Sequence, residues 1–248
     1  NQGRFVATYK YAVLIGLMDL VLETVDEDGQ PPDMYTTRQL AWKMVELYWQ
    51  HVLPYPGVTA SSLRQNSGGQ AKIVSLIERF RSRFKHTSLY RAKHTLAEPL
   101  EELIRDVEWI LIDMPLPKLQ RVGKEESRFL YEIAWSDDDK PTKRQVSRYQ
   151  RGKGGPFDNR IQLRGHVPKH LLRLSRILRP FIYREWAMMV ARINKLEVSR
   201  LHSFLFNPAR NPPTRLVADM RELQNNRCFY CAATMQTRCE VDHFVPWS

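Results

Sequence analysis

Residues 5–21 read FVATYKYAVLIGLMDLV. The apolar residues of this stretch recur at intervals of three and four, which is the spacing of one face of an α-helix. The sequence Asp26-Glu27-Asp28-Gly29 then ends the pattern, because a polar cluster that contains glycine favours a turn. We therefore predict that the chain begins with a helix that buries an apolar face in a hydrophobic core.

Further helices with the same periodicity are predicted over residues 36–48, 69–84 and 99–113. Thr36 or Thr37 can cap the first of them, because a threonine hydroxyl accepts a hydrogen bond from a free amide at a helix start. Pro115 and Pro117 are expected to end the last one, because proline lacks an amide hydrogen. These patterns predict a helical domain over residues 1–120. Its tryptophans are expected to pack between the helices: Trp42, Trp49 and Trp109.

Strand-like patterns replace the helical period after residue 120. Residues 129–135 are rich in aromatic and β-prone side chains, and residues 160–165 alternate polar with apolar side chains. A basic, glycine-containing loop is expected to join these two strands. A long helix should follow over residues 169–196, with a kink or a break at Pro180. The predicted fold is therefore mainly α with a small β insertion (α+β).

The net charge of +11 is concentrated in one segment of the chain. From Lys140 to Arg184 there are thirteen lysines and arginines and a single acid, Asp158. A positive field this localised fits a polyanionic partner such as nucleic acid, although a solvated cationic surface has the same composition. We assign residues 121–206 to a nucleic-acid-binding region. Its candidate contacts are Arg148, Arg151, Lys153, Arg164, Lys169, Arg173, Arg176 and Arg184.

Part of this set forms a cationic ridge on the predicted long helix. Its four members fall within a narrow arc of the helical wheel: Lys169, Arg173, Arg176 and Arg184. A ridge of this kind could follow a phosphate backbone without distinguishing one base sequence from another. A solvated helix face is again the other interpretation.

A chemically different signal lies near the carboxyl end of the chain. Cys228 and Cys231 form a Cys-x-x-Cys pair, and Asp242 and His243 follow as a doublet within an apolar run. Imidazole titrates near neutral pH, so His243 can serve as a general base. Carboxylate oxygens are the ligands that Mg²⁺ and Mn²⁺ prefer, so Asp242 can bind such an ion.

The stretch Val241-Asp242-His243-Phe244-Val245-Pro246, with the upstream Cys-x-x-Cys, resembles the HNH (ββα-metal) endonuclease family, including the HNH domains of CRISPR effector nucleases. The resemblance implies phosphodiester hydrolysis, with Asp242 as a ligand of Mg²⁺ or Mn²⁺ and His243 as the base that activates water. The family's Asn, and its final His or Asn on a following helix, have no counterpart before Ser248. We therefore expect residues 207–248 to be an incomplete HNH module, and the chain as given to be inactive.

The larger arrangement, a helical region followed by an HNH module, resembles bacterial HNH endonucleases that are associated with phage-defence loci. The likeness includes Glu46-Leu47-Tyr48-Trp49 and Leu63-Arg64-Gln65-Asn66. This longer likeness fixes no substrate, but it implies a role in bacterial defence, and a regulatory protein partner is compatible with it. The HNH motif and the basic segment together favour nucleic acid as the substrate, with DNA preferred. The oligomeric state stays open. The alternative function is a non-catalytic nucleic-acid-binding or scaffold subunit with an HNH-like zinc knuckle.

The cysteines raise the question of a second metal. The spacing of Cys228 and Cys231 is that of a zinc knuckle, a structural zinc ion needs four ligands, and Cys239 could supply a third. A metal-free turn packed by Phe229 and Tyr230 is the alternative. Three cysteines without a secretory signal favour a reducing cytoplasm. No apolar run reaches the length of about 18 residues that suggests a membrane span.

Overall fold

The computed structural model describes residues 7–56, 58, 62–85, 87–122, 125–126, 128–206, 221, 224–228 and 231–235. The chain divides into two compact units, Asn1–Phe206 and Asn207–Ser248. The described part of the first unit is mainly helical and contains a small antiparallel sheet of three strands. The predicted class, mainly α with a small β component, is confirmed. Among the described residues, no helix is both long enough and apolar enough to cross a lipid bilayer.

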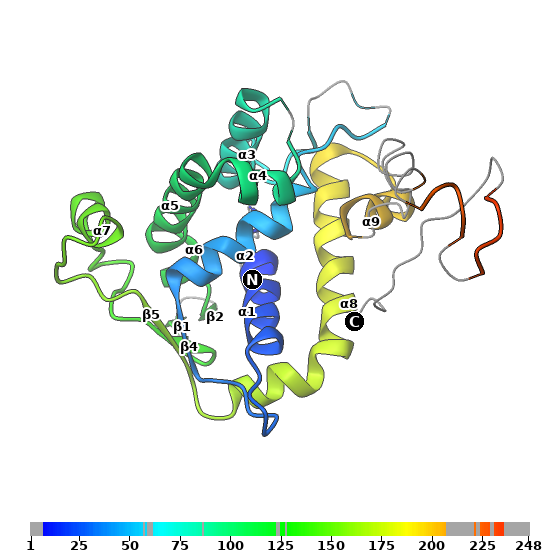
Figure 1. Ribbon diagram of the computed structural model, residues 1–248. Coiled ribbons are helices and arrows are strands. Elements are labelled where there is room, and N and C mark those ends of the chain that lie inside the picture. The colour runs from blue at the N-terminus through cyan, green and yellow to red at the C-terminus, as the bar shows by residue number, and fades with distance from the viewer. Residues whose placement is uncertain are drawn as a thin grey trace. The chain divides into compact units, whose positions relative to one another are not determined.

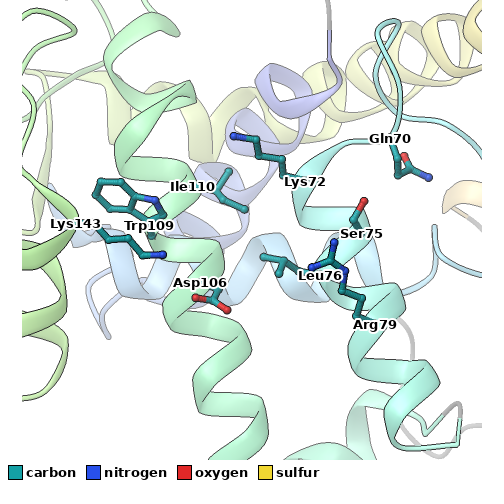
Figure 2. Close-up of a pocket in the computed structure, with 9 residues that line it drawn as sticks. All are labelled: Gln70, Lys72, Ser75, Leu76, Arg79, Asp106, Trp109, Ile110 and Lys143. Atoms are coloured by element: carbon teal, nitrogen blue, oxygen red, sulfur yellow. The ribbon is translucent and has the colours of Figure 1, made fainter.

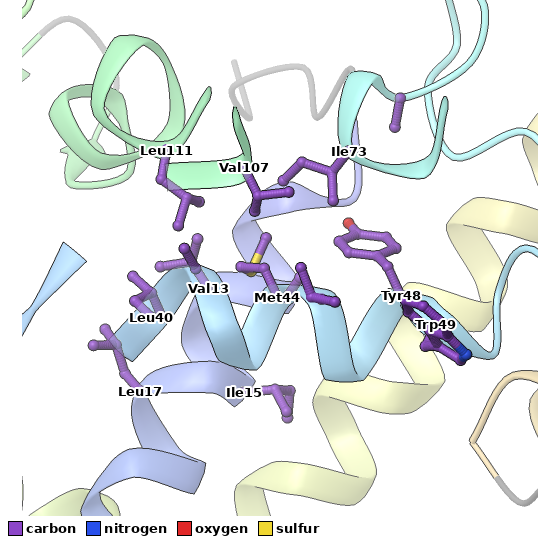
Figure 3. Packing of buried hydrophobic residues seen from close by; sticks show 14 of the residues in the cluster. Val13, Ile15, Leu17, Leu40, Met44, Tyr48, Trp49, Ile73, Val107 and Leu111 are labelled. Carbon is purple, nitrogen blue, oxygen red and sulfur yellow. The ribbon is translucent and has the colours of Figure 1, made fainter. Parts of the chain in front are cut away.

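Helix α2 (Thr37–Trp49) is central to the core of the first unit. It packs against α1 (Tyr9–Glu23), α3 (Lys72–Arg83) and α5 (Ala97–Asp113). Figure 3 shows buried side chains from these four helices meeting in one cluster. These are the helices that the apolar periodicity predicts, so this part of the prediction is confirmed.

Helices α1 and α2 approach each other closely at Gly16. A Cβ atom at this position would lie 2.9 Å from Leu40 Cδ1 and 3.3 Å from Lys43 Cβ. Both distances are shorter than the optimal separation of about 3.5–4.0 Å between carbon atoms. Glycine weakens a helix relative to alanine, and here its missing side chain lets the two helices pack directly.

A reciprocal pair of hydrogen bonds fixes the start of α2. Thr36 Oγ1 accepts from the backbone N–H of Gln39 at 3.1 Å, and Gln39 Oε1 accepts from the backbone N–H of Thr36 at 2.8 Å. This capping box satisfies amides that have no partner within the helix. The predicted cap at Thr36 is therefore confirmed.

The sheet joins segments that are far apart in the chain. Strand β5 (Arg160–Leu163) pairs on one side with β4 (Tyr131–Glu132) and on the other with β1 (Met34–Thr36), always antiparallel. Strands β4 and β5 confirm the two predicted strands. Strand β1 was not predicted, because it is only three residues long and its hydrogen-bond partners lie in a distant segment.

Several short elements lack a clear sequence pattern: α4 (Leu89–Thr95), α6 (Pro115–Lys118), β2 (Arg121–Val122), β3 (Glu125–Glu126) and α9 (Val198–Phe206). Strands β2 and β3 pair with each other. Helix α5 ends at Asp113, before Pro115, as predicted, and Pro115 then begins the short helix α6. The fixed φ of proline suits the first turn of a helix, where its missing amide hydrogen is not needed.

Helix α7 (Lys143–Gln150) occupies the segment predicted to be a basic loop between the strands. A capping box between Thr142 and Gln145 starts it, and Val146 is its buried residue. One buried position does not produce the apolar stripe by which a helix is recognised in sequence. The basic segment is therefore partly helical, which corrects the loop prediction.

The predicted long helix is confirmed as α8 (Val167–Asn194), which packs against α1 and α9. Pro180 lies inside the helix without ending it. Figure 1 shows the first part of α8 at an angle to the rest, in agreement with the expected kink. Arg179 fixes α8 to α1, because its Nη2 atom lies 2.5 Å from Asp19 Oδ1.

Candidate functional site

The catalytic pair that the sequence predicts, Asp242 and His243, lies outside the described residues, and so does Cys239. In the second unit the structure describes Cys228, Cys231 and several neighbours. In the first unit it describes the whole basic segment from residue 140 to residue 184. The described candidate residues therefore fall into two groups, a cysteine turn and a basic surface.

Cys228 and Cys231 lie in a tight turn that backbone hydrogen bonds close. The N–H of Cys228 donates to the carbonyl of Ala233, and the N–H of Ala232 donates to the carbonyl of Cys228, both at 2.8 Å. An antiparallel bridge between the flanking residues extends this pairing. The two cysteines thus belong to one short hairpin.

The chemistry of this pair fits part of a zinc site. Both residues are present as thiols, with Cys231 exposed and Cys228 half-buried. Cysteine sulfur is a preferred zinc ligand, and structural zinc sites often contain two cysteines with two residues between them. No group of three or more potential metal-ligating side chains occurs within the described residues. Any further ligand to a zinc ion would therefore come from outside them.

The cationic ridge (Lys169, Arg173, Arg176 and Arg184) lies on an exposed face of α8. All four side chains are exposed. In the part of the chain that the structure describes, no carboxylate forms an ion pair with any of them, whereas the neighbouring Arg179 is paired with Asp19. The four positive charges of the ridge are therefore available to bind an anion.

Apolar side chains lie beside the ridge on the same helix. Leu174, Ile177 and Phe181 are 42%, 60% and 60% exposed, respectively. Their positions on the helical wheel are adjacent to those of the ridge residues. Positive charges next to an exposed aromatic ring suit phosphates and unstacked bases, which bind through charge and through ring faces.

A second group of predicted contacts, Arg148, Arg151 and Lys153, gathers at the end of α7. The backbone N–H groups of Arg151 and Lys153 both donate to the carbonyl of Arg148, at 3.3 and 3.0 Å. This turn brings three exposed cationic residues together, and we call them the α7 patch. The structure therefore places these three predicted contacts in one local surface.

Arg164 differs from the other predicted contacts. Its Nη1 donates to the carbonyl of Arg128 at 2.7 Å, and its Nε lies 3.2 Å from Glu132 Oε1. The charge of Arg164 is thus partly compensated within the protein. It is the weakest member of the predicted set for binding an external phosphate.

A buried carboxylate of α5 that was not among the predicted site residues contacts α7, the helix that leads into the α7 patch. Glu108 is fully buried and accepts from Thr37 Oγ1 at 2.6 Å and from Gln150 Nε2 at 2.9 Å. Arg38 Nη1 lies 3.5 Å from the same carboxylate. Burial lowers the pKa of Arg38, and the neighbouring Glu108 opposes that shift. The network links α2, α5 and α7. Its one sign in the sequence is that Glu108 occupies a position of α5 where the apolar periodicity predicts a buried side chain.

His51 is the most deeply buried histidine among the described residues, and it is structural. Its Nε2 lies 3.1 Å from the carbonyl of Leu205, which can only accept, so Nε2 carries the proton. Its Nδ1 then accepts from Gln65 Nε2 at 3.3 Å, and Gln65 Oε1 accepts from Trp186 Nε1 at 2.9 Å. Since the imidazole is only 1% exposed, it cannot act on an external substrate.

Comparisons with known protein families, with curated proteins and with solved structures found no match to this chain. Evidence for its function therefore comes from the chemistry of its own residues. The residues that bear on it are the cysteine turn, the cationic ridge, the α7 patch and the Asp242-His243 doublet.

Proposed function

We propose that this protein is a metal-dependent endonuclease of the HNH type that hydrolyses phosphodiester bonds in nucleic acid, with DNA favoured. The observation that carries the proposal is the closed turn of Cys228 and Cys231, which precedes the Asp242-His243 doublet in the sequence. A zinc knuckle needs two thiolates in one tight turn. The backbone hydrogen bonds of this hairpin hold both cysteines in such a turn, which supports the proposal.

Asp242 and His243 have different tasks in this proposal. His243 accepts the proton of the attacking water, because a neutral imidazole is a competent base near pH 7. Asp242 binds Mg²⁺ or Mn²⁺, which when bound stabilises the negative charge that develops on the phosphate oxygens. Cys228 and Cys231 hold a structural zinc ion that stabilises the fold of the second unit.

The ridge and the α7 patch bind the phosphate backbone of the substrate. Both surfaces are exposed and positively charged, and contacts to phosphates fix position without distinguishing one base sequence from another. We therefore expect binding with little sequence preference and with strong dependence on salt concentration. The exposed thiol of Cys231 fits a reducing compartment, which supports a cytoplasmic location.

The full-length protein with His243→Ala tests the catalytic assignment. We expect cleavage to fall by at least about 100-fold, because a positioned general base contributes that much, while affinity for DNA stays unchanged. Cleavage rates and fluorescence anisotropy measure the two quantities. The matched control is His94→Ala, which removes an exposed histidine from α4 and should cleave like the wild type. Cleavage near the wild-type rate by the His243 variant would overturn the assignment.

A non-catalytic nucleic-acid-binding subunit is the second candidate function. The exposed ridge favours it, because that surface can bind phosphates without any catalytic residue. The full-length wild-type protein, supplied with Mg²⁺, Mn²⁺ and Zn²⁺, distinguishes the two. Binding without cleavage under all these conditions would favour the binding subunit.

A further inference from the structure

A groove opens on the surface of the first unit between α3, α5 and α7 (Figure 2). Its volume is about 360 Å³. Pockets for small molecules usually have volumes of about 300–1,000 Å³, so this groove fits a small ligand. None of the residues that line it belongs to the cationic ridge, to the α7 patch or to the cysteine turn.

The groove carries an excess of positive charge. Lys72 and Arg79 from α3 and Lys143 from α7 line it together with one carboxylate, Asp106 of α5. All four side chains are exposed, and no ion pair among the described residues involves any of the three cations. Figure 2 shows Lys143, Asp106 and Arg79 lining the groove from α7, α5 and α3, respectively.

This charge balance selects a particular kind of anion. Three positive charges against one negative leave an excess of two in the lining. A phosphate monoester carries a charge of about −1.5 to −2 at pH 7, which such a lining would neutralise. Arg79 can donate two parallel hydrogen bonds to phosphate oxygens, whereas the lysines act as point charges.

An aromatic side chain lines the groove together with these charged residues. Trp109 of α5 is half-buried and lines the groove, with apolar side chains of Leu76 and Ile110 nearby (Figure 2). The face of an indole ring stacks on other flat rings. Gln70 at the rim is already engaged, because its Nε2 donates to Ser62 Oγ at 2.9 Å. The groove therefore combines a phosphate-binding region with an apolar surface for a ring.

We propose that this groove binds a 5′-mononucleotide. Its phosphate monoester is held by Lys72, Arg79 and Lys143, and its base stacks on Trp109. Inorganic phosphate uses only the cations and a nucleoside only the tryptophan, so the nucleotide binds more tightly than either fragment. The inference does not rest on the nuclease proposal, because no groove residue belongs to the HNH motif.

Calorimetric titration of the full-length protein with adenosine 5′-monophosphate, inorganic phosphate and adenosine tests the proposal. We expect one nucleotide per chain, bound at least about fivefold more tightly than either fragment, which corresponds to stacking of one base. Inorganic phosphate that binds as tightly as the nucleotide would overturn the stacking arrangement. No nucleotide binding at millimolar concentration would overturn the site.

Paired variants locate the ligand. Lys143→Gln should weaken nucleotide binding about tenfold, because it removes a charge-assisted hydrogen bond. The control Arg144→Gln removes the same charge from the next residue of α7, which does not line the groove, and should change affinity by less than about twofold. Equal losses in the two variants would show a diffuse charge effect and contradict the site.

Trp109→Leu tests the ring-binding surface of the groove separately from its phosphate-binding region. This variant should reduce nucleotide affinity to that of inorganic phosphate while phosphate binding stays unchanged. A variant that keeps the full nucleotide affinity would contradict the role of Trp109.

A 5′-phosphorylated tetranucleotide then identifies the source of the ligand. Tighter binding than the mononucleotide assigns the site to the end of a strand, and equal or weaker binding assigns it to a free nucleotide.

Discussion

His51 is held in its neutral form by its surroundings, since its Nε2–H donates to a carbonyl and its Nδ1 accepts from an amide. Burial lowers the pKa of this imidazole from 6.5 to about 3. Below pH 6.5 the unfolded chain therefore takes up a proton that the folded protein excludes. Folding becomes less favourable as the pH falls through this range, and the effect is complete near pH 3.

We predict that His51 reduces the free energy of unfolding by about 2 kcal/mol between pH 7 and pH 5, as proton linkage requires. Urea denaturation at both pH values measures the change. His51→Gln should be less stable than the wild type at pH 7 but should lose this part of the pH dependence. His94→Gln, on the exposed surface of α4, should keep it. An unchanged pH dependence in the His51 variant would refute the prediction.

At the scale of elements, α7 is a short helix that depends on one buried carboxylate. Its last residue, Gln150, donates to Glu108 at 2.9 Å and to the carbonyl of Arg105 at 3.0 Å. We predict that Glu108→Ala destabilises the first unit by about 1–3 kcal/mol, because the buried Thr37 hydroxyl loses its acceptor, whereas Arg38 keeps its ion pair with Glu101. Chemical denaturation measures the loss.

Glu102→Ala is the matched control for this change. Glu102 lies on the same helix but on its exposed face, so we expect its loss to alter stability by less than about 0.5 kcal/mol. The two variants remove the same charge and differ mainly in burial. Similar small losses in both would show that the Glu108 network does not stabilise α7.

Helix α8 offers a second prediction at this scale. Replacing Arg173 and Arg176 together by Gln should lower the slope of log K against log salt for DNA binding by roughly 2, since each phosphate contact contributes about 0.9. The control replaces Arg91 and Arg200, which are exposed on α4 and α9, in the same way. Anisotropy titrations at several salt concentrations give both slopes. Equal slopes for the two double variants would exclude the ridge as the binding surface.

In the whole molecule, the elements that the sequence predicts are those with a local pattern, and the elements that it misses depend on contacts with distant parts of the chain. Helices α1, α2, α3, α5 and α8 have long apolar stripes, so local periodicity reveals them. Strand β1 forms because it pairs with β5, with Met34 opposite Gln162. The local sequence around β1 gives no sign of this distant partner. Helix α7 has one buried side chain, Val146, and is held by contacts with α5.

The candidate sites divide in the same way. The pair Cys228 and Cys231 is visible in the sequence because its spacing is local, and the ridge on α8 is visible because one helix carries it. The groove was not predicted, because Lys72, Trp109 and Lys143 come from three separate helices. Folding alone brings their side chains together, so their spacing along the chain carries no signal.

The pairing of β1 with β5 and the packing of α1 on α8 have a consequence for synthesis on the ribosome. Translation proceeds at roughly 5–20 residues per second, so the amino-terminal helix and strand leave the exit tunnel several seconds before their partners exist. During that time the surface of α1 that packs on α8 and the edge of β1 that pairs with β5 are open to other chains. Until β5 and α8 have emerged, the nascent chain is therefore more prone to associate with other chains than the finished protein is.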